Sequence, residues 1–128
     1  MAVECFRIQM KNVFVECEIK DARKFMSDKT VMIVPLLSGG GMRVKIVEGL
    51  AAGKVIVSTS IGAEGIACTH GENILIANTA EEFANTILSC LNNHVLLNKI
   101  SANAQLLARN VYDNSQIGKH VAAFYNTL

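Results

Sequence analysis

The chain has 128 residues, of which 51% are hydrophobic and 18% are charged, and its formal net charge at pH 7 is +1. This length suits one domain, and the apolar content excludes an intrinsically disordered chain. The near-neutral charge gives no electrostatic reason to expect a nucleic-acid partner. The longest apolar runs, such as residues 31–37, are far shorter than the ~20 residues of a membrane-spanning helix.

The cysteines are Cys5, Cys17, Cys68 and Cys90. None of them belongs to a C-x-x-C pair, and no histidine stands beside them at metal-ligand spacing. This pattern predicts reduced, mostly buried thiols in a cytoplasmic protein, with no bound metal.

Short apolar runs alternate with helical patterns along the chain. The expected elements are a strand over 13–15, a helix over 21–28, a strand over 31–35, a helix over 42–52, strands over 55–57 and 74–76, a helix from 79, a helix over 95–110, and a last helix ending near 125. Strands that alternate with helices predict an α/β fold, an open parallel sheet with helices on both faces.

The run 31–35 is continuously apolar, which predicts a strand buried on both faces that ends at Pro35. In the helix that follows, the expected buried stripe consists of Val44, Val47, Leu50 and Ala51. Gly53 is the expected C-terminal stop of this helix. Later in the chain, Thr79 with Glu82 and Asp113 with Gln116 are typical helix N-caps.

The strongest local feature is the turn Ser38 to Gly41 between a strand and a helix. Parallel sheets bind ligands beyond the carboxyl ends of their strands, and a helix N-terminus there attracts anions. Consecutive glycines let a diphosphate approach the backbone. The turn lacks the Gly-Lys-Ser/Thr of a Walker loop and the spacing of a G-x-G-x-x-G fingerprint. A tight turn without any ligand remains an equal alternative.

Four charged side chains lie where they would face such a ligand. Glu48, near the second turn of the helix, would accept hydrogen bonds from ribose hydroxyls, or would pair with Lys45 on the surface. Arg43 and Lys45 would neutralise phosphate, or would belong to a solvated face. Glu64 follows a second strand and would face the same crevice. The dispersed histidines His70, His94 and His120 suggest no catalytic arrangement.

Residues 31–66, VMIVPLLSGGGMRVKIVEGLAAGKVIVSTSIGAEGI, resemble the core of the retaining group 1 glycosyltransferases, which have the GT-B fold. The family pattern is a strand ending in proline, a glycine-rich turn, a helix with a glutamate before Leu-Ala-x-Gly, and a strand running into Thr-x-x-Gly. Residues 48–53 and 55–65 follow it closely, and a weaker match extends from 12 to about 125.

The resemblance implies the C-terminal, Rossmann-like domain of a hexosyltransferase-type enzyme that binds a nucleotide-diphospho-sugar donor. It places Glu48 at the donor ribose, the glycine turn and the helix start at the diphosphate, and Ile19 and Asp21 beside the base. No cofactor or metal is expected, and the catalytic residues are not identified. The full set of donor-binding residues expected is Ile19, Asp21, Gly39, Gly40, Gly41, Met42, Arg43, Lys45, Glu48 and Glu64.

Two departures from the family pattern affect the function. Many members have another glutamate eight positions before the one that Glu48 matches. Here that position is Gly40, so the contact that this other glutamate makes to the donor sugar is not implied. Lys54 replaces a common proline, with little expected effect. The chain is also short for the family, which has a separate N-terminal domain for the sugar, lipid or other acceptor.

We therefore expect residues 1–128 to be one partial domain, a fragment or a truncated gene product, without the acceptor domain and without the opening strand–helix unit of the donor domain. Such a chain would be inactive alone and prone to self-association. In the full enzyme a peripheral position at the membrane is an alternative to a purely cytoplasmic one. A non-enzymatic flavodoxin-like module that binds a phosphorylated ligand or a protein is the competing interpretation. A nucleotide-sugar epimerase is disfavoured because the G-x-G-x-x-G fingerprint is absent.

Overall fold

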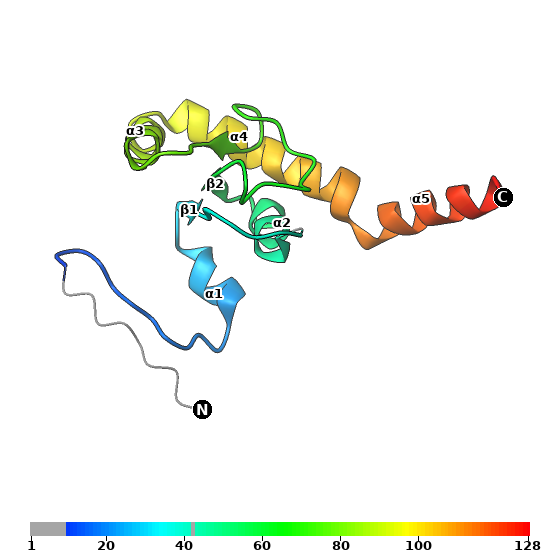
Figure 1. Ribbon diagram of the computed structural model, residues 1–128, viewed down its shortest axis with the longest axis horizontal. Helices are drawn as coiled ribbons and strands as arrows, with labels where there is room; N and C mark the ends of the chain where they lie inside the picture. The colour runs from blue at the N-terminus through cyan, green and yellow to red at the C-terminus, as the bar shows by residue number, and fades with distance from the viewer. Residues whose placement is uncertain (1–9, 42) are drawn as a thin grey trace.

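The computed structural model describes residues 10–41 and 43–128 (Figure 1). Three strands and six helical segments follow one another in this part of the chain. Their bounds are α1 Ala22–Ser27, β1 Val31–Val34, α2 Val44–Ala51, β2 Val55–Ser58, β3 Leu75–Ile76, α3 Ala80–Leu91, α4 His94–Leu107, the π-helical η1 Ala108–Tyr112 and α5 Asn114–Asn126. This order confirms the expected α/β alternation.

The sheet is parallel, with β2 between β1 and β3. Val31 pairs with Val55 and Val34 with Ser58, whereas β3 pairs only with the carboxyl end of β2. The carboxyl ends of all three strands therefore meet at one edge, where the glycine turn also begins.

Alternate residues of β2 build two cores on opposite faces of the sheet. Ile56 packs with Ile46 and Leu50 of α2 on one face. Val55 and Val57 face the other way, into a core shared with α3 and the first half of α4. The open parallel sheet with helices on both faces is thus confirmed, and all four residues of β2 are buried as the apolar run predicts.

The edge strand β1 differs from its prediction. Ile33 is 53% exposed, so the expectation that this strand is buried on both faces is wrong. Within the described residues β2 is its only partner strand, and α3 covers this face only in part: Val31 packs against the core that includes Phe83 and Ile87, whereas Ile33 stays exposed. The expected strand over 13–15 is also wrong, because these residues form no ladder and Phe14 is 86% exposed.

Helix α2 buries only part of the expected stripe, since Leu50 is buried and Val47 packs against the core, but the other two residues are exposed. Ile46, Gly49 and Leu50 are buried, whereas Val44 is 63% exposed and Ala51 is also exposed. The reason is close packing at Gly49, where an added Cβ would lie 2.9 Å from Met32 Sδ and 3.1 Å from Ile56 Cδ1. Helical periodicity alone does not show which glycine makes the closest approach to a sheet.

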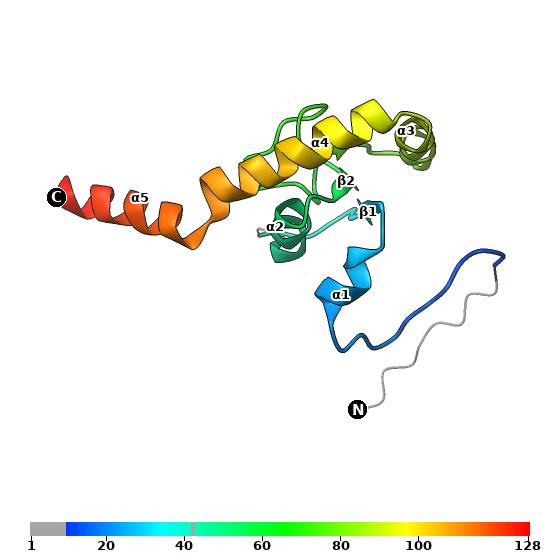
Figure 2. The same cartoon turned by 180° about the vertical axis from the view of Figure 1, so that it is seen from behind.

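The C-terminal helices agree with the sequence more closely. Thr79 Oγ1 accepts a hydrogen bond from Glu82 N, and the Glu82 carboxylate accepts one from Asn78 N, which confirms the cap of α3. Asp113 caps α5 by accepting from Ser115 N. Helix α5 has no buried residue and extends away from the sheet, as the front and rear views agree (Figures 1 and 2).

Cysteines occur both in a disulfide and as free thiols. Cys17 is disulfide-bonded, so the expectation of four reduced cysteines is wrong, whereas Cys68 and Cys90 are free thiols. Burial raises the pKa of both free thiols above the ordinary value. In the described part of the chain, no helix has the length and apolar character needed to cross a membrane.

Candidate functional site

A network of buried hydroxyl groups shapes the carboxyl edge of the sheet. Thr59 N donates to Val34 O at 3.2 Å, and Thr59 Oγ1 donates to Leu36 O at 2.5 Å and accepts from Gly62 N at 2.9 Å. An added Cβ at Gly62 would lie 2.5 Å from Ser58 Oγ and 3.1 Å from Val34 O. Gly62 therefore lets the loop after β2 close over the ends of β1 and β2, a role that the sequence did not reveal.

The glycine turn after β1 divides its glycines between two roles. Gly39 has φ +128°, and a Cβ there would lie 2.4 Å from Arg43 Nη2, so its missing side chain makes room for the arginine. Gly41 has φ +81°, which favours glycine for conformational reasons. No atom of residues 10–41 and 43–128 lies within 4 Å of a Cβ at Gly40 or Gly41, so both face open space there.

The N-terminus of α2 meets this open space. Its N-cap residue, Arg43, makes no side-chain cap, so among the described residues no side chain bonds the amides of Val44 and Lys45. Arg43 Nη1 instead donates to Gly40 O at 2.8 Å, and its Nε is buried without a hydrogen-bond partner among the described residues. A guanidinium group, free amides and the positive end of a helix dipole thus converge on one turn, an arrangement that suits an anion.

Glu48 lies four residues further along α2, about 6 Å along the helix axis from Val44. It is half-buried and makes no hydrogen bond or ion pair within the described residues, so the alternative of a surface pair with Lys45 is not found. Lys45 is exposed on the same helix. Glu48 instead lines a cavity of about 530 Å³ whose other residues are Arg23, Met26, Ser27, Ala51, Ala52 and Lys54.

Helix α1 forms the opposite wall of that cavity. Asp21 is its N-cap and accepts a hydrogen bond from Lys24 N at 3.1 Å. Ile19 lies in the loop before it and is 37% exposed. Neither residue lines the cavity beside Glu48. The structure thus brings the element they begin to Glu48, but not their own side chains.

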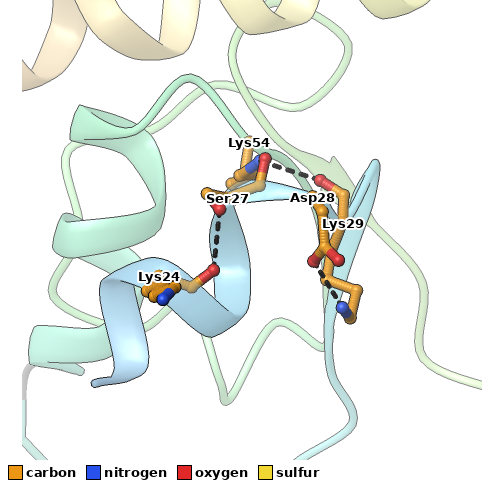
Figure 3. Close-up of polar contacts among 5 residues, drawn as sticks. All are labelled: Lys24, Ser27, Asp28, Lys29 and Lys54. Carbon is orange, nitrogen blue, oxygen red and sulfur yellow. Dashed lines mark hydrogen bonds and ion pairs between the residues drawn. The ribbon is translucent and has the colours of Figure 1, made fainter.

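Lys54 has contacts in this region that the sequence did not predict. Helix α2 ends in a Schellman motif, in which Gly53, with φ +69°, donates to Leu50 O and Lys54 N donates to Gly49 O at 2.9 Å. The expected stop at Gly53 is confirmed. A proline at position 54 has no N–H for this bond, and it also lacks the ammonium group that Figure 3 shows at the end of α1.

The remaining candidates lie apart from these residues. Glu64 is exposed in the turn after β2, and it does not line the cavity beside Glu48. Met42 lies outside the described residues. His70 Nδ1 accepts a hydrogen bond from Ile76 N at 2.9 Å, which is a structural role. No group of three or more His, Cys, Asp or Glu side chains suited to a metal occurs in 10–41 and 43–128.

Known proteins are similar to this chain in sequence or in fold. An uncharacterised 44.6 kDa protein in the cps region of Klebsiella pneumoniae is 33% identical over 87 residues, which cover 68% of this chain and 22% of that protein. HepE of Anabaena, solved with UDP, has a TM-score of 0.76 at 23% identity, over 86% of this chain and 31% of HepE. The C-terminal domain of LpcC, a group 1 family glycosyl transferase of Francisella tularensis, has a TM-score of 0.68 at 16% identity, over 77% of this chain and 53% of that domain.

The two structural likenesses bear on the fold, and they agree with the parallel sheet and its covering helices. The chain spans less than a quarter of the Klebsiella relative and less than a third of HepE. The family model for glycosyl transferases group 1 matches residues 3–93, well over half of the chain. This chain therefore belongs to the group 1 glycosyltransferase family.

Proposed function

We propose that this chain is the donor-binding part of a glycosyltransferase, and that it binds the nucleoside diphosphate portion of a nucleotide-diphospho-sugar. The observation that carries the proposal is the pairing of an open glycine turn at the start of α2 with an unpaired carboxylate one helical turn further on. HepE, which has the same fold, was solved with UDP and with UDP-glucose. The parent protein would be a hexosyltransferase.

The chemistry of the site suits a leaving diphosphate. Arg43 lies on the turn, with Nη1 2.8 Å from Gly40 O, and Lys45 is exposed on the first turn of α2. Positive charge and backbone amides placed where negative charge develops stabilise a departing phosphate group. We propose that these groups act without a bound metal or cofactor. Chelation by EDTA should then leave the affinity for UDP unchanged.

The ribose contact is assigned to Glu48. A carboxylate accepts hydrogen bonds from two hydroxyl groups at once, and Glu48 has no competing partner among the described residues. Gly40 takes the place of the family's other glutamate, so this chain supplies no acidic contact to the sugar from that position. Ile19, Asp21 and Glu64 remain proposed contacts at the periphery of the site.

The test is a titration of the purified chain with UDP, GDP and the 2′-deoxy form of UDP. We expect weak binding of a nucleoside diphosphate and a preference for the ribose form. Glu48→Ala should abolish this preference, whereas Glu81→Ala, which removes an exposed glutamate from α3, should keep it. Absence of any binding at millimolar nucleotide would reject the proposal and favour the non-enzymatic module.

The state of the isolated chain is part of the same proposal. Donor and acceptor must be held together for transfer, and we propose that the acceptor domain is not contained in residues 1–128. The outer edge of β1 has no partner strand within the described residues, and Ile33 and Leu37 are exposed there, which supports self-association. A cytoplasmic location also remains a proposal, to be tested by cell fractionation.

A further inference from the structure

Helix α1 is too short to be stable by itself. It has six residues and buries none of them, and isolated helices of fewer than ~12–15 residues are marginal in water. Its own sequence supplies the Asp21 cap at one end and, just beyond the other end, Lys29 Nζ above the Phe25 ring at 4.6 Å. These local contacts do not attach the helix to the rest of the molecule, yet α1 forms one wall of the cavity that contains Glu48.

Lys54 makes that attachment. Its Nζ donates to Ser27 O at 3.1 Å and to Lys29 O at 2.8 Å (Figure 3). The first carbonyl belongs to the last residue of α1, where a cation is favoured by the helix dipole and satisfies an unpaired acceptor. Among the described residues, no other hydrogen bond joins α1 to residues 43–128.

The backbone of Lys54 is fixed independently of α1. Its N–H closes the Schellman motif of α2 through Gly49 O. Its side chain lines the cavity beside Glu48 and also a smaller one, of about 150 Å³, which Val31 and Met32 at the start of β1 line as well. The side chain therefore leaves a rigid helix end, lines two hollows and reaches the last residue of α1.

We propose that Lys54 is a positioning residue that holds α1 opposite Glu48 and thereby sets recognition of the nucleoside part of the ligand. This inference rests on the proposed function for its ligand, because Arg23, Met26 and Ser27 can face a ribose or base only if α1 is held in place. The diphosphate, bound at the glycine turn and the start of α2, needs no contact from α1.

The variant that tests this is Lys54→Met, which keeps the backbone bond and the apolar stem but removes the ammonium group. Lys54→Arg restores a cationic donor. Lys119→Met is the matched control, because Lys119 is exposed on α5 and its loss changes the net charge equally. Amide hydrogen exchange is measured for residues 22–28 and for β2, together with the affinities for UDP and for inorganic pyrophosphate.

We expect Lys54→Met to speed exchange in 22–28 by about threefold to tenfold, the range that corresponds to the net worth of one hydrogen bond. Exchange in β2 should not change, which excludes general unfolding. The affinity for UDP should fall by a similar factor while that for pyrophosphate stays constant. Lys54→Arg should recover most of both effects, and Lys119→Met should show neither.

Unchanged exchange in 22–28 would overturn the role of Lys54 in holding α1. Faster exchange with an unchanged ratio of UDP to pyrophosphate affinity would overturn its role in nucleoside recognition. If wild-type protein binds pyrophosphate but no nucleoside diphosphate, the proposed function and the recognition role both fail, while hydrogen exchange still decides whether Lys54 fixes the helix. Wild-type binding of UDP with equal binding by Lys54→Met leaves the proposed function intact and rejects this inference alone.

Discussion

The substitution Gly40→Val should weaken ligand binding at the glycine turn while leaving the stability of the protein almost unchanged. Gly40 lies in the middle of the turn, its φ is not positive, and no atom of the described residues lies within 4 Å of an added Cβ. The free protein therefore has room for a valine. When a diphosphate accepts hydrogen bonds from the amides of the turn, it occupies the space that a valine side chain at position 40 needs.

The expected magnitudes follow from this geometry. Without a clash or a positive φ, the free energy of unfolding should change by no more than ~0.5 kcal/mol. In the complex, crowding of the two valine methyl groups against the ligand should cost about 1–3 kcal/mol, which weakens the Kd by roughly 5- to 150-fold. Gly41→Val is a poorer probe because Gly41 has φ +81°, and a branched residue there costs ~1–2 kcal/mol of stability without any ligand.

Calorimetric titration with UDP and thermal unfolding of the same samples measure both quantities. Gly118→Val is the matched control, since Gly118 lies on α5 and a Cβ there also meets nothing within 4 Å. A Gly40→Val protein that binds UDP with the wild-type Kd would show that the diphosphate does not approach this turn. A loss of several degrees in Tm would show instead that Gly40 has a structural neighbour in solution.

Four further results are expected. Glu48→Gln should leave the melting temperature nearly unchanged, because Glu48 makes no hydrogen bond among the described residues. In a titration, the same substitution should lower the affinity for UDP more than the affinity for pyrophosphate. Gly62→Ala should destabilise the protein by ~1–3 kcal/mol in urea unfolding, because its Cβ meets Ser58 Oγ at 2.5 Å; a wild-type urea midpoint would contradict this packing. Hydrogen bonds from Ser115 hold the pKa of Asp113 below its ordinary value of 3.8, so the contribution of this cap is present above that pH and is lost as the pH falls through the lower, folded-state pKa; Asp113→Asn should remove this part of the acid transition seen by circular dichroism. The purified chain should not transfer glucose from UDP-glucose and should sediment as concentration-dependent oligomers; transfer abolished by Glu48→Ala would contradict the first expectation, and a monomer at all concentrations the second.

The sequence predicted the positions of β1 and β2 well, but it predicted the burial of only one of them. Strand β2 is buried on both faces, and its continuous apolar run indicated as much. The run at β1 is equally apolar, yet Ile33 is exposed because β1 lies at an edge of the sheet. An apolar pattern reports what a strand is able to bury, and only the arrangement of the other elements decides what it does bury.

In the candidate site too, local features could be predicted from the sequence, whereas contacts between distant residues could not. The glycine turn and its position before a helix could be predicted, since both are local features. The role of Gly39 could not, because it depends on where the Arg43 side chain turns back. The contacts of Lys54 join residues 27 and 25 positions apart in the chain. The sequence marked position 54 only as a departure from the family pattern, and it contained no signal for the carbonyl groups that the ammonium reaches.

The length of helix α2 fixes the spacing between the glycine turn, Glu48 and Lys54. Its start is set by the glycine turn and its end by the Schellman motif at Gly53, so both ends are determined by backbone geometry. Eight residues span about 12 Å, and they place Glu48 one turn after the start of the helix and six residues before Lys54. Because Gly49 packs against Met32 and Ile56, the helix cannot slide or rotate without a clash. The spacing between the anion-binding turn and the carboxylate is therefore a rigid property of the fold, and a ligand that uses both must match it.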